Sequence, residues 1–129
     1  INQVFVGSVH AIAHQIGGRY GIPHGLANAL ILPHVLEYCR EEAQPRLAEL
    51  AVVIGAGEQG EPEAQLAHKF IAAVRELRTQ VGIPDRSDLI RREDHEALTA
   101  AAVAECMDYP VPRLLDEAST LAILNQITD

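Results

Sequence analysis

The residue types best suited to chemistry gather in one segment, HAIAHQIGGRYGIPHG, which spans residues 10–25. His10 and His14 are four residues apart, so on a helix both side chains project from the same face. His24 follows several glycines, where a reversing connector can bring its ring back beside that helix. Neutral imidazole binds zinc, iron, nickel and copper. The spacing therefore predicts a metal site, with solvated or core-packed rings as the alternative.

Three imidazoles do not complete a catalytic metal site. Such metals usually take a carboxylate or further imidazoles and keep one position open for water or substrate. No Asp or Glu lies between Ile1 and Pro33. Any remaining ligand must therefore come from elsewhere.

Hydrophobic periodicity predicts the helices that position these histidines. The first helix is expected over residues 2–17, ending at Gly17-Gly18, and a connector follows over residues 19–25. The segment 26–38 is apolar nearly all round, so we expect a central helix with a kink at Pro33. Further helices are expected over residues 45–55, 62–82, 93–106 and 116–127, with a break at residues 109–112.

Two of these helices have a clear predicted inward face. The face of the long helix consists of Leu66, Phe70, Val74, Leu77 and Val81, and that of the last helix of Leu121, Leu124 and Ile127. No linker is long enough to divide the chain. We therefore predict an all-α fold, a bundle of about six helices that forms one domain over residues 1–129.

The composition agrees with helix packing and narrows the possible functions. The chain is 48% hydrophobic but only 4% aromatic, and its formal charge of −8 argues against nucleic acid and anionic membranes as partners. No apolar run is long enough for a membrane helix. Cys39 and Cys106 fit no zinc or redox spacing, so we predict buried free thiols and a cytoplasmic protein.

A longer motif carries a family resemblance. VHAIAHQIGGRYGIPHGLANALILPHV, residues 9–35, resembles the signature of the iron-containing (group III) alcohol dehydrogenases of the dehydroquinate synthase-like superfamily. MDYPVPRLLDEASTLAILNQI, residues 107–127, is similar to the C-terminal helix region of that family. The resemblance spans nearly the whole chain but only the last third of a family member.

The resemblance implies a dehydrogenase of two domains, an N-terminal domain that binds NAD or NADP and a helical domain that binds a divalent metal, usually iron and sometimes zinc. By resemblance His10 and His24 are metal ligands, and an Asp and a third His lie on a helix before Ile1. His14 is implied to lie beside the nicotinamide and the substrate, as a catalytic and cofactor-binding residue. Spacing alone instead pairs His10 with His14.

The implied chemistry is hydride transfer between a small alcohol or aldehyde and the nicotinamide, with the metal as Lewis acid. The chain has no glycine-rich nucleotide turn after a strand, so we expect these residues alone to be inactive. An apolar stripe of Val4, Phe5, Val9 and Ile12 predicts a homo-oligomer. The alternative is a free-standing helical module for oligomerisation or metal binding that has kept the signature.

The remaining candidates have structural explanations. His34 is expected to pack or hydrogen-bond within the central helix, and His68 and His95 to be solvated. Arg113 is expected to make a helix-edge or interdomain contact.

Overall fold

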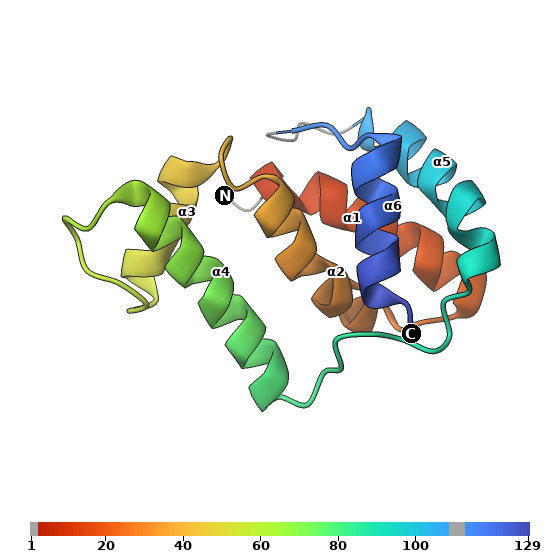
Figure 1. The fold of residues 1–129 in the computed structure, drawn as a ribbon, viewed down its shortest axis with the longest axis horizontal. Coiled ribbons are helices and arrows are strands. Elements are labelled where there is room, and N and C mark those ends of the chain that lie inside the picture. The colour runs from red at the N-terminus through yellow and green to blue at the C-terminus, as the bar shows by residue number, and fades with distance from the viewer. Residues whose placement is uncertain (1–2, 109–112) are drawn as a thin grey trace.

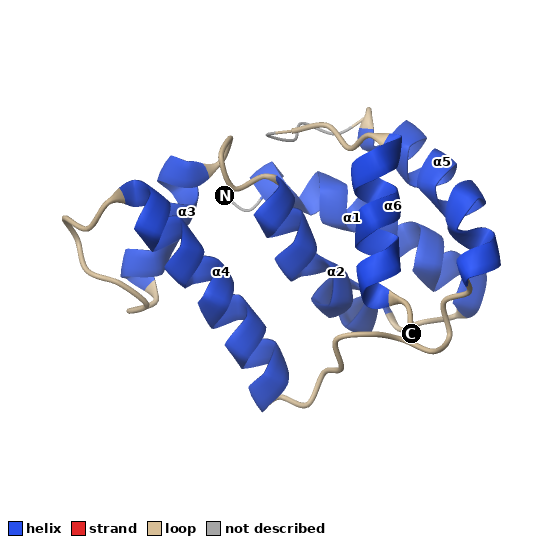
Figure 2. Cartoon of the chain, viewed as in Figure 1, coloured by secondary structure: helices blue, strands red, loops and turns tan. Residues whose placement is uncertain are grey.

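The computed structural model describes residues 3–108 and 113–129, and of residues 3–6 the backbone only. The described chain folds into six α-helices and one short 3-10 helix, η1 (Figures 1 and 2). It contains no strand, and one isolated bridge joins Ser87 to Thr128. The all-α prediction is confirmed. The elements are α1 (Gln3–Tyr20), α2 (His24–Tyr38), α3 (Gln44–Val53), α4 (Glu63–Gln80), η1 (Arg92–Asp94), α5 (His95–Cys106) and α6 (Glu117–Ile127).

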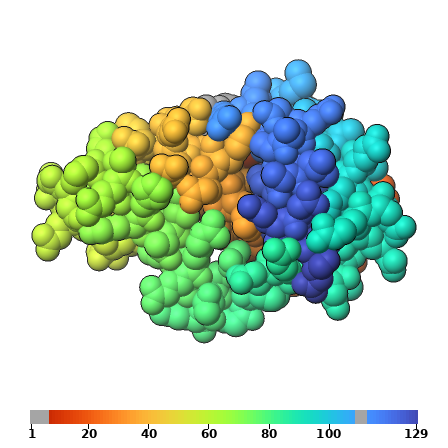
Figure 3. Space-filling model, viewed as in Figure 1, coloured from red at the N-terminus to blue at the C-terminus, as the bar shows by residue number. Residues whose placement is uncertain are grey.

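Helix α2 lies at the centre of the molecule (Figure 1). It contacts α1, α4 and α6, while α3 packs on α4 and α5 packs against both α1 and α6. The α3–α4 pair forms one end of the molecule and α5 with α6 the other (Figure 3). The apolar circumference of α2 is buried as predicted, at Ala27, Leu30, Ile31, Val35 and Leu36.

The first helix continues past the predicted stop. Gly17 and Gly18 lie inside α1, which ends at Tyr20. The chain reverses at Gly21 instead, which has a φ of +69° and whose N–H donates to the Gly17 carbonyl at 3.0 Å. The double glycine does not end the helix because neither residue takes the left-handed conformation that Gly21 supplies. This short turn starts α2 at His24.

Replacing the helical Gly18 with alanine and replacing the turn residue Gly21 with alanine are expected to change the free energy of unfolding in opposite directions. Gly18→Ala is expected to raise the free energy of unfolding by about 0.5–1 kcal/mol, because Gly18 is an exposed helical residue with open space around its Cβ position. Gly21→Ala is expected to lower it by about 1 kcal/mol or more, because alanine is strained at that φ. Urea unfolding followed by circular dichroism measures both. A destabilising Gly18→Ala would contradict the helix that runs to Tyr20.

Two predicted inward faces need correction. Leu77 and Val81 are 58% and 62% exposed, because the packing of α3 covers the other end of α4, where Leu66 is buried. In α6 the predicted Leu124 and Ile127 are buried, but Leu121 is 40% exposed. The inward face of α6 is instead completed by Thr120 and Ile123.

Two residues of the predicted apolar stripe on α1 are covered by other helices of the same chain. Val9 and Ile12 are 7% and 1% exposed, so they are buried within the chain itself and need no second copy. They are covered because α1 packs against α2 and α5. The side chains of Val4 and Phe5 lie outside the described residues. The homo-oligomer stays a prediction.

The structure also bears on the predictions for the cysteines and for Arg113. Cys39 and Cys106 are buried free thiols, as predicted, and burial raises the pKa of Cys39 to about 11. Arg113 makes a helix-edge contact, with its guanidinium 4.1 Å from the centre of the Tyr38 ring. The expected break at residues 109–112 lies outside the described residues. No helix in the described part of the chain is long and apolar enough to cross a membrane.

His68 is exposed as predicted, whereas the prediction of a solvated His95 is wrong. The chain after α6 places Thr128 on the His95 ring, with Oγ1 2.9 Å from Nε2. The Thr128 hydroxyl gives its one proton to the Leu124 carbonyl at 2.6 Å, so His95 Nε2 is the donor to that hydroxyl. Burial lowers the pKa of His95.

His34 lies half-buried in α2 and lines a cavity of about 610 Å³ together with Arg75 and Arg78. Burial, and then the two guanidinium groups, lower its pKa to about 4, while a hydrogen bond with Gln126 acts in the opposite direction. The ring therefore packs in the helix as a neutral group.

This shift predicts an acid-sensitive fold. Between pH 6.5 and about pH 4 the unfolded chain takes up a proton that folded His34 resists, so stability falls as the pH falls through this window. After allowance for partial exposure, we expect His34 to contribute up to about 2 kcal/mol to the loss. Urea unfolding of the wild type and of His34→Gln at pH 7 and 4.5 measures it. His68→Gln, which alters an exposed histidine, is the control and should keep the wild-type pH dependence.

Candidate metal and substrate site

A cavity of about 640 Å³ lies among α1, α2, α3 and α4, on the side of α2 that faces the α3–α4 pair. Its polar side chains are His10, His24 and Asn28, and the Oδ1 atom of Asn28 is buried without a partner in the described part of the chain. The rest of the lining is apolar or glycine and consists of Val9, Gly25, Ala29, Leu32, Leu36, Leu50 and Phe70. This is an apolar pocket with a few convergent polar groups, which is typical of a small-molecule site.

His10 and His24 reach this cavity from two helices. His10 lies in α1, and the turn at Gly21 brings the first residue of α2, His24, back beside it. The ring centroids are 5.9 Å apart and the rings meet edge to face at 68°. Sequence reasoning placed His24 beside the first helix, and the structure brings the two rings together. Their joint role as metal ligands stays a prediction.

His14 lies one helical turn after His10 on α1 and stacks on it, with ring centroids 5.5 Å apart and 28° between the ring planes. Unlike His10 and His24, it is not part of the cavity lining. Its side chain is 64% exposed. The ring of His10 thus contacts both of the other rings, and we call His10, His14 and His24 the histidine row.

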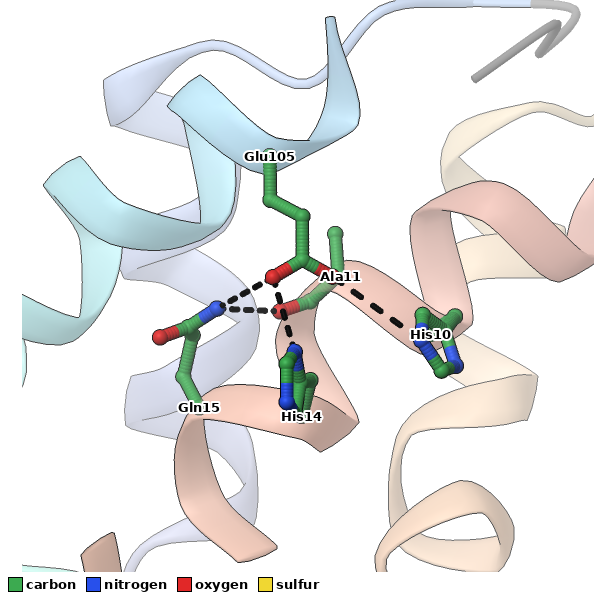
Figure 4. A network of polar contacts seen from close by, with 5 residues as sticks. All are labelled: His10, Ala11, His14, Gln15 and Glu105. Carbon is green, nitrogen blue, oxygen red and sulfur yellow. Dashed lines mark hydrogen bonds and ion pairs between the residues drawn. The ribbon is translucent and has the colours of Figure 1, made fainter. Parts of the chain in front are cut away.

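Glu105, from the last turn of α5, is a site residue that sequence reasoning missed. Its Oε1 atom lies 2.9 Å from His14 Nδ1, and its Oε2 atom lies 4.0 Å from His10 Nε2 (Figure 4). Gln15 Nε2 donates to the same Oε1 at 3.0 Å. A faint signal exists in the sequence, since an acidic residue in the last turn of a helix is electrostatically unfavourable without a partner.

The donor atoms fit a divalent transition metal. One ligand atom from each of His10, His14 and Glu105 lies within 4.8 Å of the other two. Imidazole nitrogen and carboxylate oxygen are ligands that iron and zinc share. His10 therefore shares one donor set with His14 and Glu105, and its ring also neighbours that of His24 in the lining of the cavity.

Comparisons with known proteins give one consistent family. The C-terminal model of the Fe-containing alcohol dehydrogenase family matches residues 1–128. The chain is 35% identical to 1,3-propanediol dehydrogenase of Klebsiella pneumoniae, over 97% of this chain and 33% of that protein. It is also 35% identical to lactaldehyde reductase of Escherichia coli (strain K12), over 87% of this chain and 30% of that protein.

A solved structure agrees with these sequence matches. The crystal structure of a 1,3-propanediol oxidoreductase superposes with a TM-score of 0.85 at 35% identity, over 93% of this chain and 32% of that one. The chain thus spans about a third of the length of the relatives it matches. It belongs to the Fe-containing alcohol dehydrogenase family and corresponds to the C-terminal part of that family.

Proposed function

We propose that this chain contributes the helical, metal-binding part of an NAD(P)-dependent alcohol dehydrogenase that interconverts a small alcohol and its aldehyde or ketone. The observation that carries the proposal is the pair of imidazoles, His10 and His24, which face one largely apolar cavity from two different helices. Family membership supports it, as do relatives named for small diols and aldehydes.

His10 and His24 are the residues that would hold the metal, with iron as the first expectation and zinc as the second. When bound, the cation supplies Lewis-acid chemistry, which favours loss of the alcohol proton and stabilises negative charge on the oxygen during hydride transfer to NAD(P). The two imidazoles come from helices joined by the Gly21 turn, so their separation is fixed by packed secondary structure rather than by a long loop.

The cavity wall sets the kind of substrate. Leu32, Leu50 and Phe70 come from three different helices and present apolar surface beside the two histidines. Such a wall excludes water and binds a short carbon chain, while the imidazole side of the cavity receives the oxygen. A cavity of about 640 Å³ has room for a small alcohol.

We propose that His14 contacts the nicotinamide and takes part in proton transfer. Its exposed ring stacks on that of His10 and is not part of the cavity lining, and we place it beside the nicotinamide, within reach of the hydroxyl proton. The described chain contains no strand, and hence no strand followed by a glycine-rich phosphate turn. We therefore assign most of the NAD(P) contacts to the part of the family that this chain does not match.

The test uses the complete enzyme, meaning this chain together with the nucleotide-binding part. Oxidation of small alcohols is measured with NAD and with NADP, before and after removal of metal by a chelator, and after iron or zinc is added back. We expect turnover that is lost on chelation and restored by one of the two metals. Turnover that survives complete metal removal would contradict the proposal.

A further inference from the structure

The carboxylate of Glu105, from α5, lies beside His10 and His14 of α1 (Figure 4). Its Oε1 atom accepts a hydrogen bond from Gln15 Nε2 at 3.0 Å, and the same Nε2 donates to the Ala11 carbonyl at 3.2 Å. Gln15 thereby ties Glu105 to the backbone of α1. The Glu105 side chain is 21% exposed, whereas the His14 side chain beside it is 64% exposed. The Glu105 carboxylate is therefore held more firmly than the His14 ring that it contacts.

The direction of the contact with His14 follows from the chemistry of the groups. A carboxylate only accepts hydrogen bonds, so at 2.9 Å from Oε1 the Nδ1 atom of His14 carries the proton. In the neutral ring the other nitrogen, Nε2, then has the free lone pair. Glu105 thus selects a ring orientation and a tautomer for a side chain that is otherwise largely exposed.

We propose that Glu105 is the positioning residue of His14, holding it in the Nδ1–H form so that Nε2 is presented to the reacting groups. This inference rests on the role proposed above for His14. A base held by a third group is the usual arrangement in catalytic sites, because the partner fixes which nitrogen accepts the proton. The Oε2 atom of Glu105 also lies 4.0 Å from His10 Nε2, and we assign Glu105 to the positioning of His14 and not to the metal ligands.

The first test reads the tautomer directly and needs no turnover. Nitrogen-15 spectra of the histidine rings in this chain, recorded at about pH 8.5 where an ordinary imidazole is neutral, distinguish Nδ1–H from Nε2–H. We expect the Nδ1–H form at His14 in the wild type. Glu105→Ala should move His14 to the Nε2–H form, which free histidine favours. Glu105→Gln should keep the Nδ1–H form, because the amide oxygen also accepts a hydrogen bond.

Two further variants keep this test decisive. Glu105→Asp retains the charge but is one methylene shorter, so it should also lose the Nδ1–H preference, and it replaces the alanine variant if that variant does not fold. Glu96→Ala removes the other carboxylate of α5, which is exposed, and should leave the His14 spectrum unchanged. A His14 that stays in the Nδ1–H form in Glu105→Ala or Glu105→Asp would overturn the proposal.

The second test separates a positioning residue from a ligand. In the complete enzyme we expect Glu105→Ala to lower kcat by about 10–100-fold with a smaller change in KM, and to leave the amount of bound iron or zinc unchanged. Loss of metal in this variant would overturn the proposal, because it would make Glu105 a ligand with His10 and His14. If the wild-type enzyme shows no dehydrogenase turnover, the proposed function fails, and the tautomer result still decides what Glu105 does.

Discussion

Replacing His24 with alanine in the complete enzyme is expected to remove most of the bound metal and to lower kcat/KM by about a thousandfold or more. His10→Ala should have the same effect, because both rings line the cavity in which we place the cation. The loss is large because a Lewis acid contributes several kcal/mol of transition-state stabilisation. Metal content after dialysis, measured by mass spectrometry, and steady-state kinetics on the same samples test this expectation.

His14→Ala is expected to differ from the His10 and His24 variants in its metal content. We expect it to keep the metal and to lower kcat by about a hundredfold to ten-thousandfold, as is usual for loss of a group that transfers a proton. His68→Ala, at an exposed position remote in sequence, is the matched control and should change neither quantity. Metal lost from His14→Ala but retained by His24→Ala would contradict the assignment. It would place the cation on the donor set of His10, His14 and Glu105 instead.

The sequence could predict the histidine row but not its acidic partner. His10 and His14 share one helix, and His24 follows after a glycine turn, so all three positions depend on local structure alone. Glu105 is 91 residues away from His14 in the chain, and its place depends on how α5 packs on α1. Periodicity shows which face of α5 is apolar, but it does not show which neighbour that face meets.

The helices themselves were predictable because their signals are local. The apolar circumference of the second helix indicated its central place, and Pro45 and Gly82 mark element ends within a few residues of the observed ones. The end of α1 was misplaced because two adjacent glycines resemble a helix stop, while of Gly17, Gly18 and Gly21 only Gly21 takes the left-handed conformation. A glycine ends a helix when the chain must turn there, and that need arises from the packing of α2.

Burial along one helix face was harder to predict, because it depends on how far the neighbouring helices extend. His95 illustrates the same point, since only the position of Thr128 after α6 encloses its ring. In α6, Leu121 and Leu124 are three residues apart and share an apolar pattern, yet their exposed fractions are 40% and 1%. Periodicity alone does not distinguish these two leucines, so substitutions at both positions test how α6 packs.

Leu124→Ala is expected to lower the free energy of unfolding by about 3–4 kcal/mol, because it removes a fully buried side chain and leaves a cavity. Leu121→Ala, with the same change in the same helix, should cost no more than about 1 kcal/mol, because much of that side chain is already in water. Urea unfolding monitored by circular dichroism gives both values. Equal costs would mean that α6 is rotated about its axis relative to α5 and α2. The buried pair His95–Thr128 and the packing of α5, which carries Glu105, would then have to be reassigned.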